Sequence, residues 1–173
     1  MDIIPEGSAL WEYLSEAQRQ LARDGQTLLD DRELHPSERL SDYSYLVFPY
    51  AKLYEGFLKQ LFLDIGVIGE RDYHSDHFRI GKVLSPHIAR WLRKKSAYSL
   101  ILSRYGAEFS ESLWRAWKEG RNLVFHYFPH NIRRLTYEEA NALIRMVVET
   151  MERAIRTCVP PGRGSMVNIR IKS

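Results

Sequence analysis

Cysteine is almost absent from the 173-residue sequence, which has only Cys158. A single thiol excludes any disulfide within the chain and is typical of a reducing compartment. No stretch approaches the roughly 18 uncharged apolar residues that a membrane-spanning helix needs, and the best one, residues 61–68, is interrupted by Asp64 and Gly66. The N-terminus, MDIIPEGS, has no basic segment followed by an apolar run, so it is not a secretory signal. We therefore expect a cytoplasmic protein.

Several kinds of chemical site are also missing. Glycine-rich phosphate loops and nucleophilic serine or cysteine motifs do not occur. A metal site could be imagined from a cluster of five side chains, Asp72, His74, Asp76, His77 and His87. Their spacings match no closed motif, and one cysteine excludes a zinc cluster built mainly on cysteine. We expect neither a metal nor a cofactor.

The composition is that of an ordinary globular protein, with 45% hydrophobic and 27% charged residues. The length suits one domain with a hydrophobic core. The net charge is only +3, but 18 of the basic residues are arginine and 7 are lysine. Arginine binds phosphate bidentately, so this excess is compatible with a nucleic-acid partner, although genome composition explains it equally well.

Apolar residues recur with the helical period along most of the chain. We expect helices over residues 8–23, 42–65, 75–93, 97–105, from 110 to the proline at 129, and from 136 to the prolines at 160. Residues 27–38 and 70–79 are polar connections, and the tail after Pro160 alternates like a short strand or arm. Thr136 and Glu139 form a capping box before the last helix, and Pro49 should begin or kink the well-formed part of the second long helix. The sequence predicts an all-α bundle of five or six helices with a short extended tail.

One motif is a candidate for chemistry: Arg121 and His126, in R-x4-H spacing. With 18 arginines and 6 histidines in 173 positions, about 0.6 such pairs are expected by chance, and Arg71 and His77 form a similar pair in a polar connection. The context distinguishes them, because the first pair lies on an expected helix rich in aromatic residues, where a cation and an imidazole need partners or a use. Those aromatic residues are Trp114, Trp117, Phe125 and Phe128.

The residue types suit metal-independent RNA cleavage. A histidine can take a proton from a 2′-hydroxyl or give one to the leaving 5′-oxygen. An arginine can hold the phosphate and stabilise the charge that gathers on its oxygens. The two side chains are about 140° apart on an ideal helix, so we expect them to meet in a cleft that a second copy of the chain completes. The alternative is a surface ion pair for Arg121 and a satisfied core histidine at His126.

These residues resemble the HEPN superfamily, whose signature is R-x4–6-H with a polar residue directly after the arginine; here that residue is Asn122. The segment FPYAKLYEGFLKQLF (48–62), followed roughly sixty residues later by RNLVFH, is similar to the C-terminal HEPN-like domain of the RNase LS toxins, the RnlA/LsoA family. The similarity covers residues 40 to 157. It implies a HEPN-like bundle, a homodimer, endoribonuclease activity towards RNA, and a protein antitoxin that docks on this domain.

The resemblance also assigns residues on the earlier helix. Glu55 matches a functional glutamate of that family, and Lys52 stands where the family has a basic residue, although lysine cannot make a bidentate contact. The alternative for both is an exposed charge set with Lys59 on one helix face. We expect three parts in the chain: an N-terminal helical extension packed on the core (1–38), the HEPN-like domain (39–158) and a tail (159–173).

Two further features refine the expectation. HEPN toxins that are silenced by tyrosine modification carry R-x4-H-x-Y, whereas here Tyr127 directly follows the histidine, which disfavours that control mechanism. The basic run Arg90, Arg93, Lys94 and Lys95 beside Trp91 is either a solvated helix end or a contact with the RNA backbone. We therefore expect an endoribonuclease, with Arg90, Arg93 and Lys94 as substrate-binding residues; the alternative is a non-catalytic HEPN-like dimeric binding or regulatory module.

Overall fold

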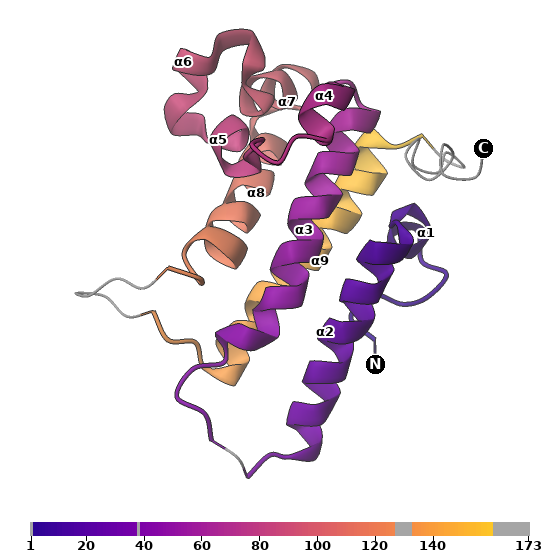
Figure 1. Ribbon diagram of the computed structural model, residues 1–173, viewed down its shortest axis with the longest axis vertical. Coiled ribbons are helices and arrows are strands. Elements are labelled where there is room, and N and C mark those ends of the chain that lie inside the picture. Colours follow the sequence, from indigo (N-terminus) through magenta and orange to yellow (C-terminus); the bar gives the residue numbers. More distant parts are fainter. Residues whose placement is uncertain (1, 38, 127–132, 161–173) are drawn as a thin grey trace.

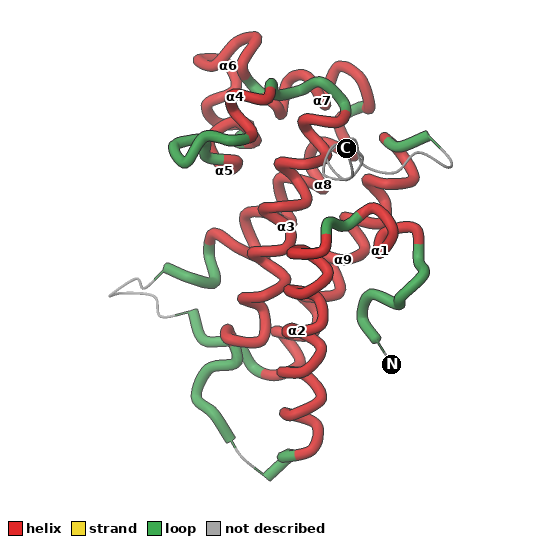
Figure 2. Tube along the Cα trace, turned by 45° about the vertical axis from the view of Figure 1, so that its right-hand side comes forward, coloured by secondary structure: helices red, strands yellow, loops and turns green. Residues whose placement is uncertain are grey.

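The computed structural model describes residues 2–37, 39–126 and 133–160, and all of its regular structure is helical (Figures 1 and 2). Three long helices lie side by side: α2 (Glu16–Leu34), α3 (Ser44–Asp64) and α9 (Tyr137–Cys158). The other helices are α1 (Ala9–Tyr13), α4 (Glu70–Tyr73), α5 (Ile80–Leu84), α6 (Ala89–Leu92), α7 (Ala97–Tyr105) and α8 (Ala107–Trp117). Five of these described helices have nine residues or more, so the prediction of an all-α bundle is confirmed.

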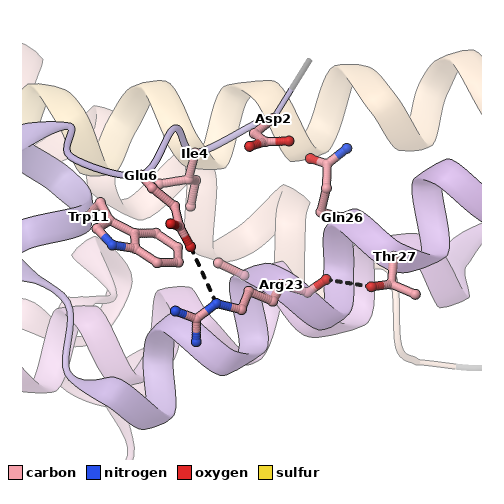
Figure 3. A pocket seen from close by; sticks show the side chains of 8 residues that line it. Asp2, Ile4, Glu6, Trp11, Arg23, Gln26 and Thr27 are labelled. Carbon is pink, nitrogen blue, oxygen red and sulfur yellow. Dashed lines mark hydrogen bonds and ion pairs between the residues drawn. The ribbon is translucent and has the colours of Figure 1, made fainter.

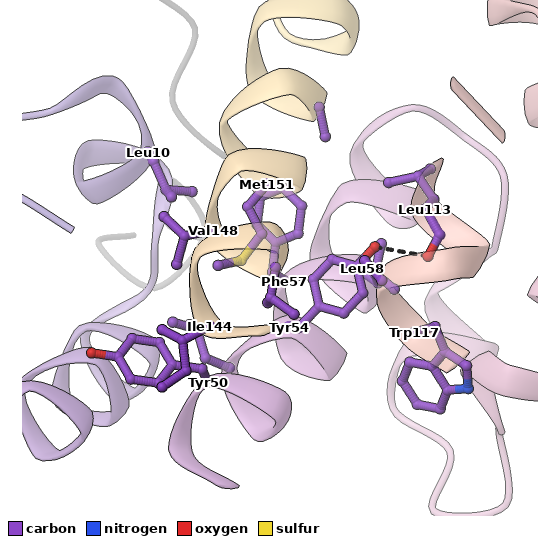
Figure 4. Packing of buried hydrophobic residues seen from close by; sticks show 14 of the residues in the cluster. Leu10, Tyr50, Tyr54, Phe57, Leu58, Leu113, Trp117, Ile144, Val148 and Met151 are labelled. Carbon is purple, nitrogen blue, oxygen red and sulfur yellow. Dashed lines mark hydrogen bonds between the residues drawn. The ribbon is translucent and has the colours of Figure 1, made fainter. Parts of the chain in front are cut away.

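Helix α3 is the centre of the bundle, because it packs against α2, α9 and α8. It runs through Pro49, having begun five residues earlier at Ser44. The apolar stripe expected from the sequence is buried in one continuous cluster, part of which is drawn in Figure 4. Its fully buried members on this helix are Leu46, Tyr50, Leu53, Tyr54, Phe57, Leu58, Leu61 and Phe62.

The N-terminal helices belong to the same core. Leu10 and Leu14, from α1 and its end, and Leu29 from α2 are buried in the cluster that surrounds α3. The buried Gln60 side chain of α3 also donates to the Tyr13 carbonyl at 2.8 Å. The helices within residues 2–34 therefore pack on the central helix through apolar contacts and at least one buried hydrogen bond.

The first expected helix, residues 8–23, begins where predicted, but it is interrupted after residue 13 and its second part continues beyond residue 23. Ser8 caps α1 as expected, but Leu14 is extended and Ser15 begins α2 with a reciprocal capping box to Gln18. Helix α2 then continues to Leu34, through most of the polar connection expected over residues 27–38. Gly25 lies inside the helix, where its missing side chain leaves room for the ring of Tyr50.

The helix expected over residues 75–93 is interrupted. Ser85 is extended, as the residue before a proline prefers, and Pro86 begins a 3-10 turn, Pro86–Ile88, between α5 and α6. A second 3-10 turn, Arg93–Lys95, follows α6. Part of the connection at 70–79 is the short helix α4.

The later helices follow the sequence more closely. Helix α7 spans Ala97–Tyr105, as predicted, and α9 begins with the predicted capping box of Thr136 and Glu139. The helix expected from Ser110 to Pro129 begins at Ala107 but ends at Trp117. The tail expected to be extended after Pro160 lies outside the described residues. None of the described helices has both the length and the apolar character that crossing a membrane requires.

Gly25→Ala should destabilise the fold. A Cβ at this position would lie 2.6 Å from Cε2 and 2.8 Å from Cζ of the buried Tyr50 ring. The overpacking, of about 1–3 kcal/mol, exceeds the gain of about 1 kcal/mol in helix propensity. We expect the free energy of unfolding in urea to fall, by up to about 2 kcal/mol.

Gly56→Ala is the matched control in α3, because its Cβ would meet mainly the end of the Gln18 side chain, at 3.2 Å. Its free energy of unfolding should stay within about 1 kcal/mol of the wild type. Equal losses in both variants would contradict the close approach of Gly25 to Tyr50.

Candidate functional site

The predicted motif lies on a turn after α8. Residues Lys118–Asn122 form a π-turn, closed by the Leu123 amide, which donates to the Lys118 carbonyl at 2.9 Å. Arg121 and Asn122 are in this turn, and His126 comes four residues after it. The expectation that Arg121 and His126 share one regular helix is therefore wrong. Short π segments often occur at functional sites because they shift side chains out of the α-helical register.

Gly120 explains how this turn reaches the core. It is buried, and a Cβ on it would lie 2.5 Å from Cγ2 of Val147 on α9. Only glycine permits this approach without a shift of Val147. The turn is consequently held against α9 on one side while it contacts α3 on another.

Arg121 and Glu55 meet between the turn and α3. One guanidinium nitrogen, Nη2, lies 3.5 Å from Glu55 Oε2, and the side chains are 38% and 28% exposed. The guanidinium carbon also lies 5.1 Å from the centre of the Trp117 ring, at cation–π distance. The structure thus brings together two predicted site residues that are 66 positions apart in the sequence.

Lys52 lies near this pair on the surface of α3. It is exposed and precedes Glu55 by three residues, so the two side chains are on the same face of the helix. Lys52 takes part in no ion pair between described residues. Lys59, the next charged residue after Glu55 on this face, is half-buried.

His126 is exposed, and Phe125, the residue before it, makes an aromatic contact with α3. The ring of Phe125 meets that of Phe48 edge to face, with 5.6 Å between centroids, although Phe48 is 54% exposed and Phe125 is 37% exposed. Asn122 is half-buried beside Arg121. Tyr127, whose position in the sequence disfavours control by tyrosine modification, lies outside the residues that the structure describes.

The predicted basic run lies elsewhere. Arg90 and Arg93 are exposed on and after α6, which Figure 1 places at the opposite end of α8 from the π-turn. Trp91 between them is 84% exposed. Lys94 lies in the 3-10 turn after α6, and its side chain is not among those described. The structure therefore does not bring these three residues together with Arg121.

Metal ligands and reactive thiols offer no alternative site in the described part of the chain. No three His, Cys, Asp or Glu side chains in that part gather into a group that could hold a metal ion. Burial raises the pKa of the Cys158 thiol to about 11, an effect that a hydrogen bond with Tyr105 only partly offsets. A thiol with this pKa stays protonated at neutral pH and is a poor nucleophile.

A small cavity of about 210 Å³ lies between the N-terminal segment and α2 (Figure 3). None of the predicted site residues lines it. Its cation, Arg23, is neutralised by Glu6 at 3.5 Å and Glu16 at 2.9 Å. This cavity is therefore not where the predicted chemistry would take place.

Sequence reasoning missed two partners of the motif. Trp117 belongs to the buried core and also contacts the Arg121 guanidinium, and its spacing of four residues before Arg121 is the signal that could have indicated this contact. Phe48 was included in the resemblance without a role, and its contact with Phe125 has no signature in the sequence.

The comparisons with known proteins were negative: no family model matches the chain, and no curated protein or solved structure shows significant similarity to it. The interpretation of the site therefore depends on its residues and their geometry.

Gly120→Ala should loosen the π-turn because its Cβ and Val147 Cγ2 cannot both fit. We expect a loss of about 1–3 kcal/mol in the free energy of unfolding. Adding Val147→Ala, which removes the opposing methyl group, should make the double variant more stable than the sum of the two single losses, by about 1 kcal/mol. Urea unfolding of the four proteins measures this coupling, and additive losses would contradict the packing of the turn on α9.

Proposed function

We propose that the chain is a metal-independent endoribonuclease of the HEPN type, with Arg121 and His126 at its active centre. The observation that carries the proposal is the pairing of Arg121 with Glu55 from a separate helix. A resemblance in the sequence assigns both residues to one site, and their side chains lie within ion-pair distance. A random R-x4-H match has no reason to lie beside that particular glutamate.

The reaction in this proposal is a transesterification. His126 takes the proton from the 2′-hydroxyl, whose oxygen attacks the adjacent phosphorus, while the bond from phosphorus to the 5′-oxygen breaks. The leaving 5′-oxygen takes up a proton, from the same histidine or from that of a second copy. The products are a 2′,3′-cyclic phosphate and a 5′-hydroxyl. Arg121 stabilises the negative charge on the non-bridging oxygens.

The remaining residues have supporting roles in the proposal. Glu55 and the Trp117 ring orient the Arg121 guanidinium before substrate binds. Lys52, exposed one turn before Glu55, can attract a neighbouring phosphate as a point charge. Asn122 would contact the substrate beside Arg121, whereas Arg90, Arg93 and Lys94 could bind only a more distant part of a long RNA.

The nuclease proposal includes two partners, a second copy of the chain and a protein antitoxin. A homodimer would place two copies of the motif together, and the exposed Phe48–Phe125 pair beside the site supports a second copy there. A protein antitoxin that covers the same face would restrain the activity. RNA as substrate implies the cytoplasm as the compartment.

One observation favours a second candidate, a non-catalytic binding module. Arg121 is already engaged by Glu55 and Trp117, as an arginine with a purely structural role would be. In that case the turn would stabilise an interaction surface, and loss of Arg121 would affect stability and partner binding without any effect on RNA.

The nuclease proposal is tested with purified protein and mixed RNA, with and without EDTA. We expect cleavage to persist in EDTA, to fall by a factor of about 10²–10⁴ in His126→Ala, and to fall at least about 10²-fold in Arg121→Ala. Glu55→Gln should lower the rate less, because it orients the arginine without touching the phosphate. A terminal 2′,3′-cyclic phosphate in the products, detected by mass spectrometry, would identify the reaction.

Arg153→Ala is the matched control for Arg121. Arg153 is 39% exposed, pairs with Glu108 at 3.1 Å and lies 5.8 Å from the centre of the Phe109 ring, so its surroundings are similar but lie outside the site. His77→Ala is the control for His126. Cleavage at the wild-type rate in Arg121→Ala and His126→Ala would remove both residues from the chemistry and favour the binding module.

The dimer proposal predicts that Phe48→Ser weakens self-association. Removing an exposed aromatic ring should raise the dissociation constant of the dimer at least about tenfold, while the free energy of unfolding of the monomer hardly changes. Sedimentation velocity over a concentration series measures this. Leu102→Ser, an exposed leucine on α7, is the control, and an unchanged dissociation constant in Phe48→Ser would exclude this face from the interface.

A further inference from the structure

A second cavity, of about 560 Å³, lies between the end of α2, the loop that leads to α3 and the start of α9. Three arginines from distant parts of the sequence line it: Arg32, Arg39 and Arg134. We call it the triple-arginine pocket. It lies at the lower end of the bundle in Figure 1, where the loop after α2 passes the start of α9. Its volume is within the range of cavities that bind small ligands, about 300–1,000 Å³.

The charge of the pocket is poorly neutralised. None of the ion pairs between described residues involves Arg32, Arg39 or Arg134, and Glu138 is the acidic residue among the described residues that line the pocket. The other cavities differ. Arg23 in the cavity of Figure 3 has two glutamate partners, and Arg145 lines a pocket with three acidic residues, Asp2, Glu149 and Glu152.

Arg32 is held in place before any ligand binds. Its guanidinium carbon lies 5.3 Å from the centre of the Tyr43 ring and 5.4 Å from that of Tyr137. Its Nη1 donates to the His35 carbonyl at 2.6 Å, which fixes the orientation of the planar group. The Nε is buried and has no hydrogen-bond partner among the described residues. The pocket therefore contains an ordered cation whose charge no described carboxylate cancels.

Asp42, whose carboxylate interacts electrostatically with Arg134, is largely engaged elsewhere. Burial opposes ionisation of Asp42, yet hydrogen bonds from the Ser44 hydroxyl and from the Leu135 and Ser44 amides lower its pKa, with a smaller contribution from Arg134. Its Oδ1 accepts the Ser44 hydroxyl at 2.6 Å and the Leu135 amide at 3.1 Å. The pocket also adjoins the positive end of the 22-residue helix α9.

We propose that the triple-arginine pocket binds the phosphoryl group of a nucleotide, either a free mononucleotide or one nucleotide of an RNA chain. Arginine forks bind phosphate oxygens bidentately, and three of them around one cavity favour a group of more than one negative charge or a phosphate held at several oxygens. The pocket is distinct from the proposed active centre, because Tyr43 and Glu55 are twelve residues apart, about 18 Å along α3. The proposal does not depend on cleavage.

The test uses the full ¹⁵N-labelled chain and three probes: inorganic phosphate, AMP and a short single-stranded DNA, which lacks the 2′-hydroxyl that cleavage would need. Sodium chloride at matched ionic strength is the blank. We expect the amides of residues 39–43 and 134–138 to shift in a saturable way. Binding by phosphate alone identifies the phosphoryl group as sufficient, tighter binding of AMP identifies a free nucleotide, and a response to DNA alone identifies a nucleotide within a chain.

The double variant Arg39→Ala/Arg134→Ala removes two exposed arginines that make no hydrogen bond or ion pair with another described residue, so the fold should be retained. We expect it to weaken binding of the responding probe at least tenfold, while Arg71→Ala, which removes an exposed arginine on α4, changes it less than twofold. The proposal is overturned if no probe shifts these amides at 10 mM, or if the two variants bind equally. Neither result depends on whether the protein cleaves RNA.

Discussion

The buried hydrogen bond between Tyr54 and Leu113 joins α8, and with it the candidate site, to the central helix α3. The Tyr54 hydroxyl donates to the Leu113 carbonyl at 3.0 Å, and burial raises the pKa of this tyrosine well above its ordinary value. An unmet partner in this environment would cost about 1–3 kcal/mol. The bond sets the position of α8 along α3. Glu55, the next residue after Tyr54 on α3, pairs with Arg121 on the turn that follows α8.

The π-turn places Arg121 in the candidate site. Had α8 continued as a regular helix, Arg121 would have kept the α-helical spacing relative to Trp117. The Leu123 amide donates to the carbonyl of Lys118, five residues earlier, and this bond makes the turn wider than an α-helical turn. Because Gly120 has no side chain, the wider turn can lie against Val147. Packing on α9 therefore holds the turn from behind while Glu55 holds Arg121 from α3. Two long helices, α3 and α9, thus position the turn.

The sequence predicts those parts whose signals are local. Helices α3 and α9 have a clear apolar period, and the Thr136–Glu139 box fixes where α9 begins. The break at Ser15 was missed although Ser15 and Gln18 form a capping box, which is a local signal. The π-turn was missed because a tertiary contact, Gly120 against Val147, permits it. The pairing of Arg121 with Glu55 was expected only through a resemblance. The triple-arginine pocket could not be predicted, because Arg32 and Arg134 are 102 positions apart and share no motif.

The strength of the Arg121–Glu55 pair bears on whether Arg121 is structural or functional. Both side chains are more than a quarter exposed, and the closest nitrogen–oxygen distance is 3.5 Å. Such a half-exposed pair contributes about 0–1 kcal/mol to stability, so it does little by itself to hold the fold together. A phosphate that offers two oxygens to the fork can compete with a single carboxylate contact. Glu55 and Trp117 therefore orient the Arg121 guanidinium, but a phosphate can still replace the carboxylate. The proposed phosphate-binding role requires both properties, whereas a purely structural role does not.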